Sequence, residues 1–298
     1  MRYEIVEEVR DKRPLIHCIT NYVTANDVAN MILAAGASPI MAESVREAEE
    51  IAQISQALVL NMGMLTDQKL EAMILAGKRA ALMGHPVILD PVGAGASSFR
   101  REALGRILGE VSCTVIRGNR SEILCTARLL GEKTEETCLQ KGVDTAPGSE
   151  GDLQPAQGLS RYDGLLTDLS RRTGAVIVMT GETDLAADGE RIYRICNGHS
   201  MMSGITGAGC MLDGVIGAYT AVWDREGRYP VSQGVALAAA AHGLCGQLAY
   251  EKVKARKEGT GSFRTYLLDY MSRLDSKQLM GGARIEIQTI ISDSIWSD

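Results

Sequence analysis

Aromatic side chains are scarce in this sequence, which has 2 Phe, 2 Trp and 9 Tyr in 298 residues. Surfaces that bind single-stranded nucleic acids stack bases on such side chains, and this chain has few to offer. Basic residues are outnumbered as well: 31 Lys and Arg stand against 37 Asp and Glu, for a formal net charge of −6, and no dense basic cluster occurs. The composition therefore argues against a nucleic-acid partner.

Long hydrophobic runs are missing too. No apolar run reaches the roughly 18 residues of a membrane span, and the closest approach, VALAAAAHGLCG, is short and contains His242. The N-terminal stretch MRYEIVEEVRDKRP is charged throughout, unlike the apolar core of a secretory signal. These observations predict a cytoplasmic protein with no membrane partner.

Several well-known ligand spacings do not occur. The 7 cysteines include no C-x-x-C pair, which excludes zinc ribbons and thioredoxin-like redox motifs, and the 4 histidines form no metal-spaced pair. Most of the cysteines lie in apolar runs and are interpreted as buried, inert thiols. There is no Walker lysine after a glycine-rich loop and no G-x-G-x-x-G after the first strand, so neither a P-loop enzyme nor a dinucleotide-binding fold is favoured.

The sequence does contain a regular alternation of short apolar runs and helical patterns. The predicted strands SPIMA, ALVLNMG, PVILDPVG, CTVIRGN and AVIVMTGE are apolar on both faces, which is typical of a mostly parallel sheet covered by helices on both sides. We therefore expect residues 1–298 to form a single α/β domain with three layers. Helices are predicted at residues 24–35, 45–56, 66–83, 104–111, 121–130 and 162–172, and from Gly207, Val231 and Phe263.

Local signals mark some of the boundaries. Thr24 and Asp27 match a capping box, and Gly36 suits the end of the same helix. The run LAADGERIYRI predicts a hairpin with Asp-Gly in its turn, and the alternating RIEIQTI predicts an edge strand. Residues 145–158, rich in Gly and Pro, predict an exposed loop.

Polar residues follow several strands, at the edge where parallel sheets bind ligands. Asp90 precedes a glycine-rich turn and Glu122 lies in the first turn of a helix, and two such carboxylates could face a magnesium ion or its waters. Arg117 has the planar fork that clamps phosphate, and Thr180 offers a hydroxyl. Plainer interpretations remain open: Asp90 as a turn residue, Glu122 as a partner of the helix dipole, and Thr180 as the donor of a strand-end hydrogen bond. The order of these residues after successive strands favours phosphoryl transfer.

The stretch SGITGAGC ends at the start of another predicted helix. Gly207 and Gly209 allow close backbone approach, and the N–H groups of the apolar helix that follows would point at the same spot. The stretch therefore predicts an anion-binding turn, or a turn needed only for packing. Its last residue, Cys210, is open to three interpretations: a nucleophile, a base or a small residue where a helix begins.

Many of these segments resemble the motifs of the hydroxyethylthiazole kinase family of the ribokinase-like superfamily. In chain order they are PLIHCITNYVTANDVANMILAAGASPIMAES, ALVLNMG, PVILDPVGAGASSFR, VIRGNRSEI, KGVD, VIVMTGE, NGH and ITGAGC, and the resemblance runs from about Pro14 to about Phe263. It implies a ribokinase-like fold and ATP-dependent phosphorylation of 4-methyl-5-(2-hydroxyethyl)thiazole in thiamine salvage, with Mg²⁺. It also implies a homotrimer with the thiazole pocket near a subunit interface.

The resemblance further implies roles for single residues at the predicted rim. Met41 should lie against the thiazole, and Gly207 should face its alcohol. Asp90 and Glu122 should help to hold magnesium through waters. The residues that should contact ATP are Arg117 and Thr180.

Cys210 stands where ribokinase-like sugar kinases have an aspartate base, and the resembling family has cysteine there. A helix N-terminus lowers a thiol pKa from its usual value near 8.5, so Cys210 is predicted to orient the alcohol and to assist proton removal as a weak base. The anion hole should contribute more, because the transition state is loose and the proton can leave late. A packing role is the alternative, and a nucleophilic role lacks the strand–elbow signature.

Other functions remain to be weighed. A relative with the same fold could act on another small alcohol, such as hydroxymethylpyrimidine, or dehydrate a nucleotide hydrate, but such enzymes usually carry aspartate at position 210. A non-catalytic nucleotide-binding module and a cysteine hydrolase are the alternatives from other classes. Residues 145–158 look idiosyncratic, and the tail after Lys277 matches less clearly, so neither is given a function.

Overall fold

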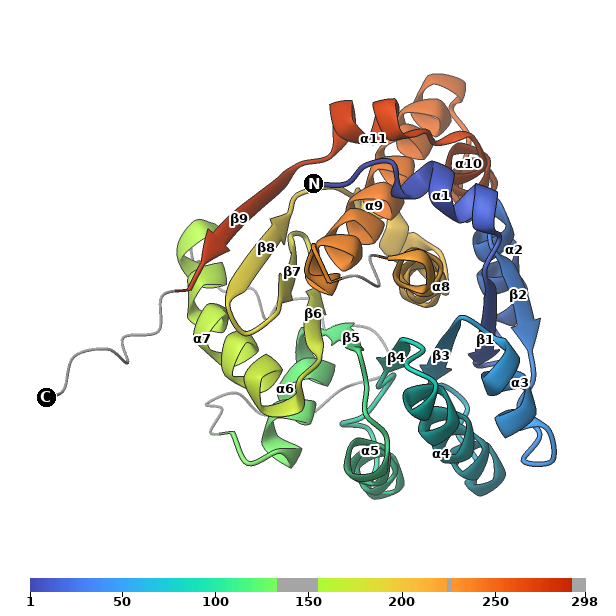
Figure 1. The fold of residues 1–298 in the computed structure, drawn as a ribbon. Helices are drawn as coiled ribbons and strands as arrows, with labels where there is room; N and C mark the ends of the chain where they lie inside the picture. Colours follow the sequence, from blue (N-terminus) through green and yellow to red (C-terminus); the bar gives the residue numbers. More distant parts are fainter. Residues whose placement is uncertain (133–154, 224–226, 291–298) are drawn as a thin grey trace, which may run out of the picture.

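The strands that the structure describes form one sheet of nine (Figure 1). The structure, a computed structural model, describes residues 1–132, 155–223 and 227–290. The strands are β1 (Leu15–Ile19), β2 (Ser38–Met41), β3 (Ala57–Asn61), β4 (Val87–Asp90), β5 (Val115–Asn119), β6 (Val176–Thr180), β7 (Asp184–Ala187), β8 (Arg191–Ile195) and β9 (Ile285–Thr289).

The order of the strands across the sheet is β2-β1-β3-β4-β5-β6-β7-β8-β9. The pairs from β2 to β6 are parallel, and those from β6 to β9 are antiparallel. After β1 the chain adds β2 on one side and then β3 on the other, which makes a topological switch point between β1 and β3. Open α/β sheets bind ligands at the carboxyl ends of the strands at such a point.

Helices cover both faces of the sheet (Figure 1). One face carries α1, α2, α8, α9, α10 and α11, and the other carries α3 to α7. No helix within the described ranges combines the length and the apolar character that a membrane crossing needs. The helices are α1 (Ile5–Lys12), α2 (Ala25–Ala35), α3 (Ala48–Ile54), α4 (Asp67–Leu82), α5 (Ser98–Glu110), α6 (Arg120–Leu129), α7 (Pro155–Thr173), the 3₁₀ helix η1 (Ser200–Gly204), α8 (Ala208–Val222), α9 (Val231–Arg256), α10 (Thr260–Arg273) and α11 (Ser276–Gly282).

Strand residues alternate between two apolar clusters, one on each face. Val59 of β3 packs in the cluster with α2, α8 and α9, whereas Leu58 and Leu60 pack in the cluster with α4 and α5. This alternation follows from the two-residue period of a strand, and it explains why the strands are apolar on both faces.

Helix α8 packs very close to strands β1 and β3 and to helix α2 because it has a glycine at each of these contacts. A Cβ atom on Gly217 would lie 3.1 Å from Cγ2 of Val59 and 3.2 Å from Cγ2 of Ile16. A Cβ atom on Gly214 would lie 2.8 Å from Cγ1 of Ile32 in α2. The backbone of α8 is therefore packed directly against β1, β3 and α2, and the start of this helix is held at a fixed place over the sheet.

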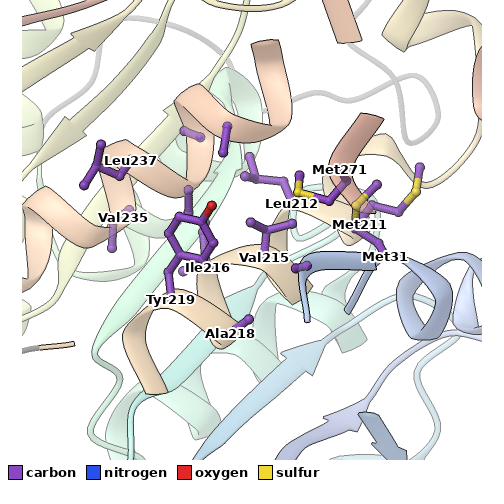
Figure 2. Packing of buried hydrophobic residues seen from close by; sticks show 14 of the residues in the cluster. Met31, Met211, Leu212, Val215, Ile216, Ala218, Tyr219, Val235, Leu237 and Met271 are labelled. Atoms are coloured by element: carbon purple, nitrogen blue, oxygen red, sulfur yellow. The ribbon is translucent and has the colours of Figure 1, made fainter. Parts of the chain in front are cut away.

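The other side chains of α8 fill the core between α2 and α9 (Figure 2). Met211 lies beside Met31 of α2, and Tyr219 and Ile216 lie toward Val235 of α9 (Figure 2). These side chains are all buried, which is consistent with the continuous apolar character of the sequence in this helix.

The structure confirms the predicted fold class: a mostly parallel sheet with helices on both faces. The predicted hairpin forms β7 and β8, and RIEIQTI supplies β9 at the edge of the sheet. Residues 1–23 carry no predicted element, yet they include α1 and β1. The signals were present, since Ile5, Val6 and Val9 fall on one buried face of α1 and Pro14 stands directly before β1.

Some boundaries differ from the predictions. The predicted capping box at Thr24 and Asp27 is wrong. The side chain of Thr24 makes no cap hydrogen bond, and Asp27 pairs with Arg264 of α10 instead. Helix α5 begins at Ser98 rather than at residue 104, because the side chain of Ser97 caps it. Helix α3 is shorter than predicted. Of the predicted loop 145–158, the last four residues begin α7, and the rest lies outside the described residues.

Candidate active site

The carboxyl ends of the central strands line up at one rim of the sheet. Asn61 of β3 pairs in register with Asp90 of β4, and Asn119 of β5 pairs with Thr180 of β6. The side chains that the sequence places after separate strands therefore become neighbours in space. The first turn of α8 lies over this rim, because Asn61 and Arg117 both contact it.

Arg117 is the centre of a buried ion-pair cluster. Its Nε donates to Oδ1 of Asp213 at 2.7 Å, and its Nη2 donates to Oδ2 of Asp213 and to Oδ2 of Asp90, both at 2.5 Å. All three side chains are almost completely buried. The two carboxylates raise the pKa of Arg117 further above its usual value against the opposing effect of burial, so the guanidinium stays charged.

Asp90 has one oxygen in hydrogen bonds and one without a partner. Oδ2 accepts from Nδ2 of Asn61 at 2.6 Å as well as from Arg117. Within the described residues Oδ1 is buried and has no hydrogen-bond partner. Burial and the nearby charges of Asp213 and Glu122 raise the pKa of Asp90, against the opposing effect of Arg117. An unpaired oxygen in so acidic a place is suited to a cation or to its waters.

Glu122 serves both as a helix cap and as part of the acidic cluster. In the capping box at the start of α6, its Oε2 accepts from N of Asn119 at 2.8 Å. Its Oε1 accepts from N of Gly93 in the turn after β4, at 2.9 Å. Burial raises the pKa of Glu122, and these two hydrogen bonds oppose the effect. Glu122 lies in the first turn of α6, as the helix-dipole interpretation has it, and the same side chain ties α6 to the turn after Asp90.

Cys210 lies in the first turn of α8 between two asparagine side chains. Nδ2 of Asn61 is 3.3 Å and Nδ2 of Asn21 is 3.7 Å from its Sγ. Nδ2 of Asn21 also donates to Oδ1 of Asn61 at 3.0 Å, which joins β1 to β3 across the switch point. Burial and the charges of Asp90 and Asp213 raise the pKa of Cys210 to about 12. The predicted lowering by the helix N-terminus is therefore outweighed, and the thiol is protonated at neutral pH.

Gly207 forms the turn that opens α8. It is the N-cap residue with φ of 81°, in the left-handed region that favours glycine. A Cβ atom here would lie 2.7 Å from Cγ2 of Thr24, and one on Gly209 would lie 2.8 Å from Nη1 of Arg117. Glycine at both positions therefore lets the turn pack closely against Thr24 and Arg117, and the free N–H groups of a helix start are the kind of donors that bind anions.

A second group of side chains surrounds the ends of β1 and β2. Lys69 of α4 is 4% exposed, and its Nζ donates to the carbonyl of Thr20 at 2.9 Å and pairs with Glu43 at 3.0 Å. The same ammonium lies 4.6 Å from the ring centre of Tyr22, whose hydroxyl donates to Glu43. Lys69 thus holds the residues after β1 and β2 together. Met41, at the end of edge strand β2, is 40% exposed beside them.

The structure brings most of the predicted site residues together. Asp90, Arg117 and Cys210 form one cluster, and Glu122 reaches the turn after Asp90. Thr180 lies next in the sheet, where its hydroxyl donates to the carbonyl of Gly118 at 3.3 Å. This is the strand-end hydrogen bond of the plainer interpretation. Met41 lies apart from the cluster, because β1 separates its strand from β3.

Other residues of the site carry no role in the sequence analysis. They are Asn21, Lys69 and Asp213. The signal for Asp213 is its position, because an acidic residue interrupts the otherwise apolar run MLDGVIGAY. Asn21 and Lys69 lie in ordinary polar surroundings in the sequence, and only the fold brings them to the rim.

A glycine-opened helix start above buried carboxylates suits the transfer of a phosphoryl group, since that reaction depends mainly on positioning and charge neutralisation. On this fold it defines a ribokinase-like kinase. A solved ribokinase-like protein from Enterococcus faecalis has the same fold, with a TM-score of 0.58 at 13% identity over 93% of this chain and 96% of that one.

Comparisons of sequence give the family. The model of the hydroxyethylthiazole kinase family matches residues 6–277. Hydroxyethylthiazole kinases from Desulfovibrio desulfuricans and Clostridium acetobutylicum are 42% and 43% identical, each over 96% of this chain and over 98% and 99% of their own length. The solved hydroxyethylthiazole kinase of Pyrococcus horikoshii has a TM-score of 0.79 at 30% identity, over 97% of this chain and 100% of that one. The chain belongs to the hydroxyethylthiazole kinase family and is a kinase.

Proposed function

We propose that this protein transfers the γ-phosphoryl group of ATP to the hydroxyl of 4-methyl-5-(2-hydroxyethyl)thiazole, yielding the phosphate ester for thiamine salvage. The single observation that carries the proposal is the Arg117–Asp90–Asp213 cluster beneath the glycine-opened start of α8, at the switch point of the sheet. Family membership supports the substrate, because the relatives named above are hydroxyethylthiazole kinases at about 40% identity. We further propose that the enzyme works in the cytoplasm as a homotrimer.

The proposed roles follow the two ends of the site. Arg117 and Thr180, on β5 and β6, contact ATP. Gly207 and the N–H groups behind it receive the charge that develops on the transferred phosphoryl group. Met41, at the far side of the switch point, lies against the thiazole ring, where an exposed apolar side chain suits an apolar ring.

The residues present fit a divalent cation, which we propose to be Mg²⁺. Asp90, Asp213 and Glu122 bring three carboxylates to a buried place that holds one guanidinium, and Oδ1 of Asp90 is unpaired among the described residues. Oxygen donors of this kind are the ones that Mg²⁺ prefers. Asp90 and Glu122 would hold the ion, which when bound neutralises phosphate charge. Arg117 and the start of α8 meanwhile hold the phosphates in place.

Cys210 is proposed to orient the acceptor rather than to take its proton. A thiol whose pKa is about 12 stays protonated and can donate a hydrogen bond to the alcohol oxygen, while Asn21 and Asn61 hold the sulfur in place. In the reaction the alcohol oxygen bonds to the γ-phosphorus, the bond to the β,γ-bridging oxygen breaks and ADP leaves. The alcohol proton leaves late and passes to an oxygen of the transferred phosphoryl group or to water, so a strong base is not required.

Incubation with ATP, magnesium and the thiazole alcohol tests the proposal, with mass spectrometry of the products. We expect the thiazole phosphate ester and one ADP for each ester formed. Hydroxymethylpyrimidine in place of the thiazole is the matched control, and a reaction without acceptor measures idle ATP hydrolysis. Preference for hydroxymethylpyrimidine, or ADP formation independent of any alcohol, would contradict the proposed substrate.

A further inference from the structure

Asp213 is a buried carboxylate in an apolar helix. It lies three residues after Cys210 in α8, and its exposed fraction is 0%. Burying a carboxylate is unfavourable unless a charged partner and hydrogen bonds compensate for the lost water. The buried charge of Asp213 therefore depends on the groups that it contacts.

Its partner is Arg117, in a two-pronged contact. Oδ1 and Oδ2 of Asp213 accept from Nε and Nη2 of Arg117 at 2.7 and 2.5 Å. Such a fork fixes the plane of the guanidinium group and not only its distance. Nη2 also donates to Asp90. The third nitrogen of the guanidinium group, Nη1, faces Gly209 and lies 2.8 Å from where a Cβ atom on that glycine would be.

We propose that Asp213 is a positioning residue for ATP binding, which holds Arg117 so that Nη1 lies beneath the first turn of α8. This inference rests on the proposed function, because it assumes that a phosphate group binds at this turn. The fork has a second effect. Without Asp213, the guanidinium would be free to make its two-pronged contact with Asp90 and to take up the unpaired Oδ1. Asp213 thereby keeps Arg117 available to the phosphate and Asp90 available to the cation.

The variant Asp213→Asn tests this positioning role, because it keeps the shape of the side chain and removes one acceptor of the fork. We expect KM for ATP, and Kd for a non-hydrolysable ATP analogue with magnesium, to rise about tenfold or more, as for loss of a charged hydrogen bond. KM for the thiazole alcohol should stay within about twofold of wild type.

The matched control is Asp163→Asn, which weakens another Asp–Arg pair. Asp163 of α7 is 8% exposed and pairs with Arg194 of β8, a strand that β7 separates from β6. We expect this variant to melt at a lower temperature and to keep both KM values. Equal changes in the two KM values of Asp213→Asn, or the same ATP defect in Asp163→Asn, would reduce Asp213 to a structural role.

A double-variant cycle shows whether Asp213 acts through Arg117. If it does, adding Asp213→Asn to Arg117→Met should change Kd for the ATP analogue less than about twofold, because the positioned group is already gone. The comparison of Arg117→Met with the double variant also serves if Asp213→Asn alone does not fold. The double variant loses both partners of the buried ion pair, so neither charge is left without the other. A further loss that multiplies with that of Arg117→Met would overturn the inference. If the wild-type protein makes no phosphate ester, the proposed function has failed; if it does and Asp213→Asn binds ATP normally, only this inference has failed.

Discussion

The methyl group of Thr24 occupies the space that a side chain at Gly207 would need, since Cγ2 of Thr24 lies 2.7 Å from the place of a Cβ atom on Gly207. Thr24 belongs to the turn after β1, on the side proposed to bind the alcohol acceptor, and Gly207 opens α8, where the phosphate is proposed to bind, so this contact joins the two proposed parts of the site. The methyl group of Thr24 thus fills the space between the turn after β1 and the start of α8.

Gly207→Ala should therefore abolish most of the turnover. The new methyl group meets Thr24, and φ of 81° is unfavourable for alanine. Gly84→Ala is the control, because Gly84 also has positive φ, of 68°, but nothing lies within 4 Å of an added Cβ atom. It should lower the free energy of unfolding by about 1 kcal/mol and leave kcat unchanged. Equal kcat in the two variants would contradict the argument; steady-state kinetics and urea unfolding measure both.

The Cys210 thiol should behave as a neutral group throughout the working range of the enzyme. Its pKa of about 12 predicts no thiol ionisation in the profile of kcat between pH 7 and 10. At pH 8 iodoacetamide should modify the exposed Cys196 long before Cys210, as peptide mapping would show. Cys196→Ser should consequently retain activity and lose the fast-reacting peptide. Fast labelling of Cys210 in the free enzyme would mean that its thiol is acidic after all.

Cys210→Ser and Cys210→Ala separate hydrogen bonding from packing. If the thiol orients the alcohol, serine should keep more of kcat than alanine, because a hydroxyl also donates a hydrogen bond. Full turnover with unchanged KM for the thiazole in Cys210→Ala would leave Cys210 as a packing residue only.

Magnesium should stabilise the protein more at pH 8 than at pH 5. Burial raises the pKa values of Asp90 and Glu122 in the metal-free protein, so the folded state binds protons more readily than the unfolded chain. That contribution to stability is complete below the unfolded pKa values and is lost as pH rises through the folded ones, where the uncompensated charges attract a cation. At a hundred times Kd, magnesium adds about 2.7 kcal/mol, measured as a shift in melting temperature.

Asp90→Asn is the variant that checks this assignment. It removes one buried charge, so the metal-free protein should keep its melting temperature between pH 6 and 8 better than wild type, and added magnesium should raise it little. Asp168→Asn, which changes an exposed carboxylate on α7, is the control and should respond to magnesium as wild type does. A full magnesium response in Asp90→Asn would place the cation elsewhere.

Lys69→Met should weaken binding of the acceptor and not of ATP. Lys69 joins the carbonyl of Thr20 to Glu43 under the ring of Tyr22, at the end of the rim away from β5 and β6. Its loss should raise KM for the thiazole roughly tenfold and leave KM for ATP within about twofold.

Lys78→Met is the matched control for this change. Lys78 also pairs with a glutamate, Glu110, but it is 48% exposed on the far part of the same helix, where ion pairs contribute little. It should leave both KM values unchanged. If Lys69→Met raises KM for ATP as much as KM for the thiazole, Lys69 supports the fold as a whole and not the acceptor end.

Much of the fold could be predicted because its signals are local. Short apolar strands, periodic helices and the Asp-Gly turn all appear within a few neighbouring residues, and the rim follows from the rule that parallel strands present their carboxyl ends together. Asp90, Arg117 and Thr180 could be found in the same way, since Asp90 and Thr180 end strands β4 and β6 and Arg117 lies two residues before the end of β5. Family motifs added their roles.

The features that could not be predicted depend on contacts between distant segments. The thiol of Cys210 has a helix start beside it in the sequence, but the carboxylates of Asp90 and Asp213 and the depth of burial are set by the fold, and they reverse the pKa shift. In the same way, Asp27 looks like a capping residue until Arg264, 237 positions away, pairs with it. Local sequence patterns carry no information on such partners.

Gly214 and Gly217, which allow α8 to pack closely against its neighbours, restrict substitution in one part of the site more than in the other. A Cβ atom on Gly217 would crowd Val59 and Ile16 of the sheet, and one on Gly214 would crowd Ile32 of α2, so a larger residue at either position would disturb the packing of α8. Two positions at the ends of β1 and β2 are less restricted, because the side chains of Tyr22 and Met41 are exposed. Substitutions at these two positions can therefore change the proposed acceptor end without moving α8.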